Sequence, residues 1–248
     1  MKIGDIPKSR LSKLNKGLVE TSNLTEWLAV DQRKLLKYLS KNLELSELSE
    51  IAKAMPDLSV PKQIAWIGKQ FSKDTAKKLV DHPSDIVGCW ICYSKANGAK
   101  TIKSSLSAIK PYAISNHFGL REVAWMAIRE KICLEPKKYI EALKPWVKSK
   151  NPYQRRFATE STRPRGVWAK HITELKQQPK IGIALLTPLK SDPERYVQDS
   201  VANWLNDASK DDPKWVKTIT NKWLKDSSST ATKYIVKRAT RSIKTGRK

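Results

Sequence analysis

The sequence predicts an all-α protein, built as a solenoid of stacked helix pairs. Apolar residues recur at three- and four-residue spacing, while long alternating patterns typical of β-strands are absent. Only nine glycines occur in 248 residues, and none belongs to a glycine-rich loop. A small residue inside a helical segment also recurs at a regular interval, which is typical of helical repeat proteins.

The stretch LTEWLAVDQRKLLKYL, residues 24–39, shows the helical spacing most clearly. Its apolar residues are expected to share one buried face: Leu24, Trp27, Leu28, Leu35, Leu36 and Leu39. Proline-containing clusters (HPSD, EPKK, NPYQ, SDPE and DDPK) follow along the chain. Because proline is tolerated in a first helical turn, each cluster is expected to begin a helix.

Four segments share a small residue after an apolar one: DIVGCWICYS, REVAWMAIRE, RRFATES and DSVANWLND. The small residues are Gly88, Ala124, Ala158 and Ala202, and a weaker fifth copy places Ala239 in VKRATRS. Successive copies lie 36, 34, 44 and 37 residues apart. We expect residues 1–248 to form one repeat domain, in which the second helix of each pair lines a concave face.

The chain is strongly basic, with 48 Lys and Arg against 24 Asp and Glu and a net charge of +24. A hydrophobic content of 40% allows a real core, so the charge does not indicate disorder. The cations run along the chain to a basic end at about residues 237–248, which favours a groove that follows nucleic-acid phosphates. No stretch approaches the ~20 apolar residues of a membrane span, and the N-terminus lacks a signal-peptide core, so we expect a cytoplasmic protein.

The three cysteines and three histidines do not form a metal-ligand pattern. Cys89 and Cys92 form a CxxC inside an apolar run without a second close pair, and Cys133 stands apart. We expect structural thiols, no bound metal and no organic cofactor.

The segment NPYQRRFATESTRPRGVWAKHI is the densest in cations. We expect it to clamp DNA phosphates, because the arginine fork matches phosphate geometry. The candidate DNA-binding residues are Arg155, Arg156, Arg163, Arg165 and Lys170, together with Asn203 from the next copy.

Three acids lie on these otherwise cationic segments: Glu122, Glu160 and Asp207. One interpretation is structural, since Glu160 has Arg156 and Arg163 at helical spacing. The other is that these carboxylates face a positively charged centre bound in the groove.

The blocks QRRFATESTRPRGVWA and RYVQDSVANWLNDASKDDP resemble signature blocks of the AlkC branch of the AlkC/AlkD DNA alkylation repair proteins, and LTEWLAVDQRKLL resembles an N-terminal block. The resemblance implies a HEAT-like α-helical repeat that cups duplex DNA and excises 3-methyladenine and 3-methylcytosine. It also places the catalytic residues at Glu122, Glu160, Trp168 and Asp207. The chain departs from the family pattern at Arg121, Ser161, Val167 and Trp204.

Alkylation on a ring nitrogen makes the base a cationic leaving group, so the enzyme must chiefly stabilise an oxocarbenium-like sugar. We expect one of Glu122 and Asp207 to stabilise that cation and the other to orient or deprotonate water; the sequence does not assign the two roles. Trp168 either contacts the damaged nucleotide through its π face or packs in the core. Glu160 is either catalytic or an organiser of the arginines.

We expect a monomer that acts on double-stranded DNA. The main alternative is a non-catalytic HEAT-repeat protein that binds DNA without excising a base. A scaffold for an acidic protein and an RNA-binding protein are further alternatives, although no RRM or KH motif occurs.

Overall fold

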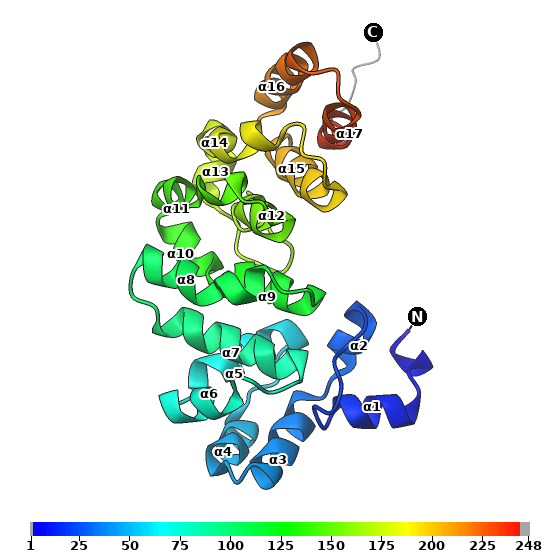
Figure 1. The fold of residues 1–248 in the computed structure, drawn as a ribbon, viewed down its shortest axis with the longest axis vertical. Coiled ribbons are helices and arrows are strands. Elements are labelled where there is room, and N and C mark those ends of the chain that lie inside the picture. The colour runs from blue at the N-terminus through cyan, green and yellow to red at the C-terminus, as the bar shows by residue number, and fades with distance from the viewer. Residues whose placement is uncertain (1, 244–248) are drawn as a thin grey trace. The chain divides into compact units, whose positions relative to one another are not determined.

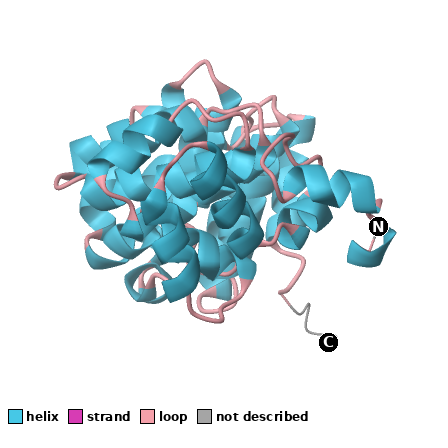
Figure 2. Ribbon diagram, turned by 90° about the horizontal axis from the view of Figure 1, so that it is seen from below, coloured by secondary structure: helices cyan, strands magenta, loops and turns pink. Residues whose placement is uncertain are grey.

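The computed structural model describes residues 2–243, and those residues contain helices and loops without a strand (Figures 1 and 2). The all-α prediction is therefore confirmed. The chain divides into two compact units, Met1–Ala127 and Ile128–Lys248. The expectation of a single repeat domain stays a prediction, and residues 244–248 of the basic C-terminal end lie outside the described residues.

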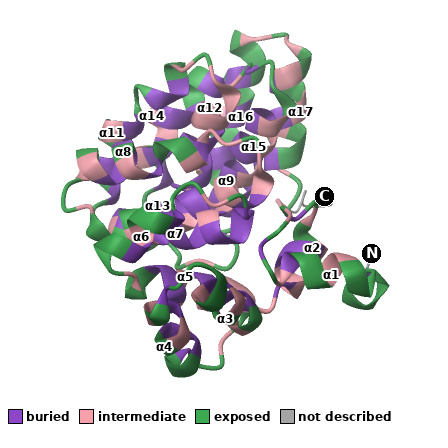
Figure 3. Cartoon of the chain, turned by 60° about the horizontal axis from the view of Figure 1, so that its bottom comes forward, coloured by how far each residue is buried: buried purple, intermediate pink, exposed green. Residues whose placement is uncertain are grey.

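Between residues 2 and 127 the first unit contains one short 3-10 helix and nine α-helices. They are η1 (Ile3–Asp5), α1 (Lys8–Leu14), α2 (Leu24–Ala29), α3 (Gln32–Asn42), α4 (Ser46–Ala54), α5 (Val60–Gln70), α6 (Lys73–Leu79), α7 (Asp85–Gly98), α8 (Ile102–Ala113) and α9 (Phe118–Ala127). Helix α7 packs against both α5 and α9. Buried residues follow most of its length (Figure 3), so α7 forms the centre of this unit's core.

Residues 24–39 form two helices and not one continuous face. The Asp31 carboxylate accepts a hydrogen bond from the Lys34 amide and thereby starts α3 as a separate helix after α2. Leu35, Leu36 and Leu39 are buried as expected, but Leu24 is exposed. The break at Val30–Asp31 takes Leu24 out of the helical register of α3.

The second unit contains further short helices and three longer ones. They are α10 (Arg129–Leu134), α11 (Pro136–Leu143), η2 (Trp146–Lys148), α12 (Pro152–Glu160), α13 (Thr173–Gln177), η3 (Pro179–Gly182), α14 (Ile183–Leu186), η4 (Thr187–Leu189), α15 (Arg195–Ala208), α16 (Pro213–Asp226) and α17 (Thr230–Ala239). Helix α15 packs against α12 on one side and α17 on the other. It holds in this unit the central place that α7 holds in the first.

Three of the five proline clusters begin a helix directly, at Pro136, Pro152 and Pro213. Pro83 and Pro193 lie one residue before the N-cap residues of α7 and α15. The clusters thus mark the helix starts correctly to within two residues, because a proline ring fits either before a helix or in its first turn.

The recurring small residues lie within helices that pack in each unit: α7 on α9 in the first, and α12 and α17 on α15 in the second. Ala124, Ala158, Ala202 and Ala239 are fully buried in α9, α12, α15 and α17. A Cβ atom on Gly88 of α7 would come within 2.9 Å of the Leu120 side chain of α9. Small side chains therefore permit close helix packing at these positions, as the repeat predicts.

Gly68 of α5 also lies at a close helix–helix contact, although it does not belong to the predicted series of repeated small residues. A Cβ atom at this position would lie 2.3 Å from the main-chain oxygen of Trp90 in α7. Gly68→Ala should therefore lower the free energy of unfolding by about 1–3 kcal/mol, because the two helices must move apart. Gly98→Ala is the matched control, since its new methyl group meets nothing within 4 Å. Urea denaturation that showed equal effects for the two variants would contradict close packing of α5 on α7.

Candidate functional site

The second unit contains a buried network of charged side chains between α12 and α15. Helix α12 begins where Asn151 accepts hydrogen bonds from the Tyr153 and Gln154 amides. Helix α12 ends at Glu160 and packs against α15. Helix α15 contributes Ser200 and Asp207 to the network. The loop that follows α12 supplies Arg163, so two helices and one loop build the network.

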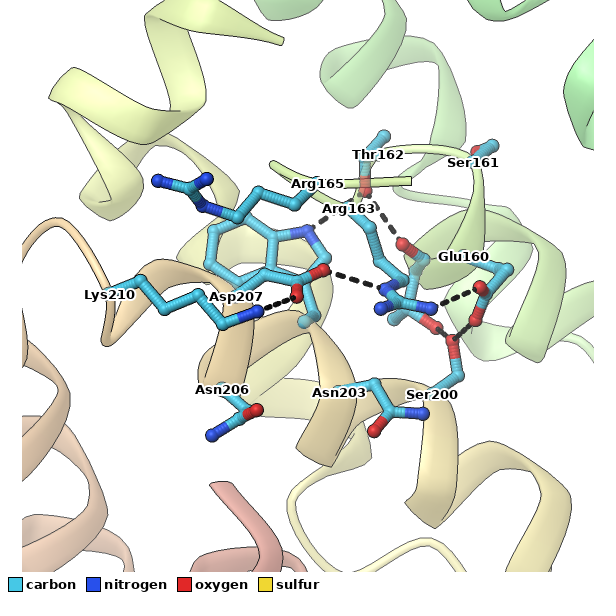
Figure 4. A network of polar contacts seen from close by, with 12 residues as sticks. Glu160, Ser161, Thr162, Arg163, Arg165, Ser200, Asn203, Asn206, Asp207 and Lys210 are labelled. Atoms are coloured by element: carbon cyan, nitrogen blue, oxygen red, sulfur yellow. Dashed lines mark hydrogen bonds and ion pairs between the residues drawn. The ribbon is translucent and has the colours of Figure 1, made fainter. Parts of the chain in front are cut away.

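Arg163 connects the two acids, as Figure 4 shows. Its Nη1 donates to Glu160 Oε1 at 2.8 Å, and its Nε donates to Asp207 Oδ2 at 2.9 Å. Glu160 is 5% exposed and Asp207 is 4% exposed. Their attraction to the guanidinium is weakly screened at this depth, so the network stabilises the packing of α12 on α15.

The remaining oxygens of the two acids have unequal partners. Glu160 Oε2 accepts from the Ser200 hydroxyl at 2.7 Å and lies 3.6 Å from Arg156 Nη2. Asp207 Oδ1 lies 3.5 Å from Lys210 Nζ, and that lysine is exposed. Asp207 is thus the acid with the looser outer contact, while Glu160 is held on both oxygens.

The charges around Glu160 decide its protonation state. Burial, the largest single influence, would raise the pKa of Glu160. The positive charges of Arg156 and Arg163, together with the hydrogen bonds from Arg163 and Ser200, outweigh burial and lower the pKa. Glu160 and Asp207 raise the pKa of Arg163 despite the opposing effect of its burial. Glu160 and Arg163 are therefore both charged at neutral pH.

Glu122 lies apart from this network in the sequence, on α9 of the first unit. Its Oε2 accepts from Trp125 Nε1 at 2.8 Å, and the side chain is half-buried. Its neighbour Arg121 donates to the main-chain oxygens of Ser115 and Asn116 and so fixes the start of α9. The indole contact orients Glu122 within its own unit.

Trp168 is exposed and has an unusual backbone. It is 59% exposed and has a φ of +55°, in the left-handed region that non-glycine residues rarely occupy. The core-packing interpretation of Trp168 is wrong, because the side chain lies at the surface of the loop between α12 and α13.

All four arginines predicted to bind DNA are engaged in contacts with the protein, Arg163 through the network described above. Arg155 forms a two-point ion pair with Asp192 at 2.7 and 2.9 Å, and Arg165 pairs with Asp211 at 2.8 Å. Arg156 is buried, with its guanidinium 4.7 Å from the centre of the Tyr196 ring. Their contact with DNA stays a prediction.

Lys170 and Asn203 are the two remaining residues predicted to bind DNA. Lys170 is exposed, whereas Asn203 is half-buried and its side-chain oxygen accepts a hydrogen bond from Arg241 at 2.9 Å. The interpretation of Glu160 as an organiser of arginines agrees with the geometry, since Arg156 and Arg163 both lie against it.

Sequence reasoning missed Arg129, which is 2% exposed at the start of α10. Its guanidinium donates to the main-chain oxygens of Ser161, Arg163 and Lys170. The helical spacing of Trp125, Arg129 and Ile132 would have placed it on the buried face. A cation on an apolar face is therefore the signal that could have revealed it.

The cysteines and the possible metal ligands form no second candidate site among the described residues. Cys89 and Cys92 are buried in α7 as expected, and burial raises the pKa of both thiols. Cys133 is only half-buried. Within residues 2–243, His, Cys, Asp and Glu side chains form no cluster of three or more able to hold a metal ion. No helix in that range has the length and apolar character needed to cross a bilayer.

The profile of the family described as DNA alkylation repair enzyme matches residues 111–243. This match covers α9 and nearly all of the second unit, including all four predicted catalytic residues. The chain belongs to the DNA alkylation repair enzyme family, and the predicted resemblance to AlkC and AlkD proteins is confirmed.

Two solved structures share the fold. The Pseudomonas fluorescens alkylpurine DNA glycosylase AlkC, bound to DNA containing an abasic site analog, is 24% identical with a TM-score of 0.65. The similarity covers 84% of this chain and 60% of AlkC. AlkD2 from Streptococcus mutans is 24% identical with a TM-score of 0.62, over 86% of this chain and 99% of AlkD2. At these identities the likeness concerns the fold.

A curated relative is the Bacillus subtilis (strain 168) protein YhaZ, which is 36% identical over 121 residues. The aligned part is 49% of this chain and 31% of YhaZ. The chain therefore spans about a third of that relative and three fifths of AlkC.

The buried network should contribute to stability in a pH-dependent way. Glu160→Gln should lower the free energy of unfolding at pH 7 by about 3–5 kcal/mol, because two arginines lose their buried partner. The pKa of Glu160 in the folded chain lies below its ordinary value of 4.5, so this contribution is present above pH 4.5 and is lost as pH falls through the folded pKa. The difference in the free energy of unfolding between the wild type and the variant, measured by urea denaturation, should become smaller in that acidic range.

Glu141→Gln provides the control for this measurement. Glu141 is exposed and pairs with Lys144 within one helical turn, so its replacement should change stability by less than about 1 kcal/mol at any pH. A wild-type advantage over Glu160→Gln that grew on acidification would be incompatible with an ionised Glu160.

Proposed function

We propose that this protein is a DNA glycosylase that hydrolyses the N-glycosidic bond of cationic N3-alkylated bases, chiefly 3-methyladenine and 3-methylcytosine. The observation that carries the proposal is the buried pair Glu160 and Asp207, which share Arg163 as ion-pair partner within a chain of net charge +24. Carboxylates weaken the attraction of a basic protein for phosphates, so their retention beside the arginines fits a positively charged transition state.

The chemistry assigns different parts to the acids. The positive base leaves without a general acid, and a carboxylate then stabilises the developing sugar cation while water attacks it. Asp207 suits contact with the sugar or the water, because Lys210 can move away from Oδ1 without uncovering a core side chain. Glu122 is the second acid, and Glu160 positions Arg163 and hence Asp207.

Trp168 completes the proposed site. Its exposed ring offers a π face to a cationic base, an attraction of about 0.5–2 kcal/mol. We further propose that the two units together form a HEAT-like solenoid whose concave, basic groove holds duplex DNA. The DNA bound by the fold relative AlkC supports this arrangement.

A second group of arginines supports DNA binding and was not predicted as part of the site. On α15, Arg195 stacks over the Tyr234 ring of α17 at 3.5 Å, and Arg238 lies 5.6 Å from the same ring. Both arginines are exposed, while Asp199 pairs with Arg238 and accepts from the Tyr234 hydroxyl. Stacking fixes the plane of the Arg195 guanidinium and leaves its N–H edge for a phosphate, while Arg238 adds positive charge at the same ring.

The alternative function is DNA binding without base excision. The ion pairs of Glu160 and Asp207 are also compatible with this alternative, because a purely structural network would have the same contacts. Measurement of base release separates the two functions.

Glu122→Gln and Asp207→Asn should each lower the rate of base release by about 100-fold or more, because one source of transition-state stabilisation is lost. Affinity for undamaged duplex should persist, since a carboxylate repels phosphates. The assay detects 3-methyladenine and 3-methylcytosine released from methylated duplex, together with alkali-labile sites. Glu141→Gln serves as the control and should release base at the wild-type rate. A wild-type protein that retards DNA but releases no base would establish the binding-only alternative.

Replacement of both Arg195 and Arg238 by Ala should weaken duplex binding and reduce the slope of log K against log salt by about 1–2, because each phosphate contact contributes about 0.9. Fluorescence anisotropy across a salt series measures this slope. Lys217→Ala with Lys225→Ala on α16 removes the same charge from two exposed positions. Equal slopes in the two double variants would show that total charge matters and that the stacked arginines do not.

A further inference from the structure

Arg129 is a buried cation whose three hydrogen bonds all go to main-chain oxygens. Its Nη1 donates to the Ser161 oxygen at 2.7 Å, its Nη2 to the Arg163 oxygen at 2.6 Å and its Nε to the Lys170 oxygen at 2.8 Å. Within residues 2–243 it forms no ion pair with a carboxylate. Glu160 and Asp207 act on it only through longer-range attraction.

Such an environment is costly for a charge. Burial lowers the pKa of Arg129 to about 10, the direction expected when the cation is removed from water. An apolar residue at this buried position, three residues before the buried Ile132 on the same helix, would avoid that desolvation cost. The guanidinium is therefore explained by what its three hydrogen bonds hold.

The three oxygens belong to the two ends of one loop. The loop leaves α12 at Ser161 and reaches α13 at Thr173, and Arg129 contacts both its first residues and Lys170. The Ile172 amide closes the same loop by donating to the Pro164 oxygen at 3.0 Å. One planar side chain thus fixes the separation of the two loop ends.

This loop carries two of the side chains in the proposed site. Arg163, whose main-chain oxygen binds Arg129, reaches Glu160 and Asp207 with its own guanidinium. Trp168 lies between the two ends with its φ of +55°, a conformation that costs about 1–3 kcal/mol unless its surroundings enforce it. Its exposed ring has few contacts to supply that enforcement, whereas the fixed loop ends can.

We propose that Arg129 is a positioning residue that holds the α12–α13 loop closed and thereby keeps Trp168 preorganised as an aromatic contact for the damaged nucleotide. The part that concerns the nucleotide rests on the proposed glycosylase function. Lysine cannot replace this arginine, because a single ammonium group cannot reach both loop ends in the geometry of the planar fork.

The first test measures the loop without any reaction. Arg129→Lys and Arg129→Gln should raise the hydrogen-exchange rate of amides in residues 163–172 at least ~10-fold, as read by mass spectrometry. Arg129→Gln removes the buried charge, so it remains informative if the lysine variant does not fold. The alkylation rate of Cys133 is a second reading, because its thiol lies 3.7–3.8 Å from the Lys170 and His171 oxygens and should become more accessible.

Arg33→Lys is the matched control. Arg33 donates to the main-chain oxygens of Ala52 and Met55 at the end of α4 in the first unit, so the chemical change is the same in the other unit. This variant should leave exchange in residues 163–172 and the rate of base release unchanged. Folded Arg129 variants with wild-type exchange in that loop would overturn the proposal.

The second test links the loop to catalysis. Arg129→Lys and Trp168→Ala should each slow base release by about 10–100-fold, and the double variant should be no slower than the slower single variant. Multiplicative losses, or an opened loop with undiminished base release, would overturn the positioning role. A wild-type protein that released no base would refute the proposed function, while the exchange experiment would still decide whether Arg129 holds the loop.

Discussion

The second unit depends on the position of one guanidinium between two buried carboxylates. Arg163 joins Glu160 at the end of α12 to Asp207 near the end of α15, so these helices have a fixed axial relation. The apolar contacts around Ala158 and Ala202 allow the close approach, but they do not determine the register as a directional ion pair does. The same contact determines which oxygens of the two acids remain for other partners.

A second constraint follows from the first. Arg163 can reach both acids only if its main chain stays where Arg129 holds it. Two arginines therefore act in series: one positions the loop through carbonyl oxygens, and the other positions the acids through its side chain. The charge of Arg163 thus acts on the acids of the proposed site, while the charge of Arg129 only maintains the loop.

The similarity to known proteins is uneven along the chain. The family profile begins at residue 111, and the α5–α7 packing of the first unit lies before it. The fold likeness to AlkC and AlkD2 extends over more than four fifths of the chain. The helical architecture is thus shared more widely than the sequence signature, because packing needs only small and apolar residues at the right spacing.

The sequence by itself determined the helical class, the buried small residues from Ala124 to Ala239 and the acids on the basic segments, because all of these follow from local spacing and composition. Only the tertiary structure decided the arginine partners that lie far away in the sequence. Asp192, 37 residues from Arg155, and Asp207, 44 residues from Arg163, come from other helices, and local spacing says nothing about such pairs. It also decided that Trp168 lies outside the core and that Arg129 lies inside it, since burial depends on what packs over a residue and not on its type alone.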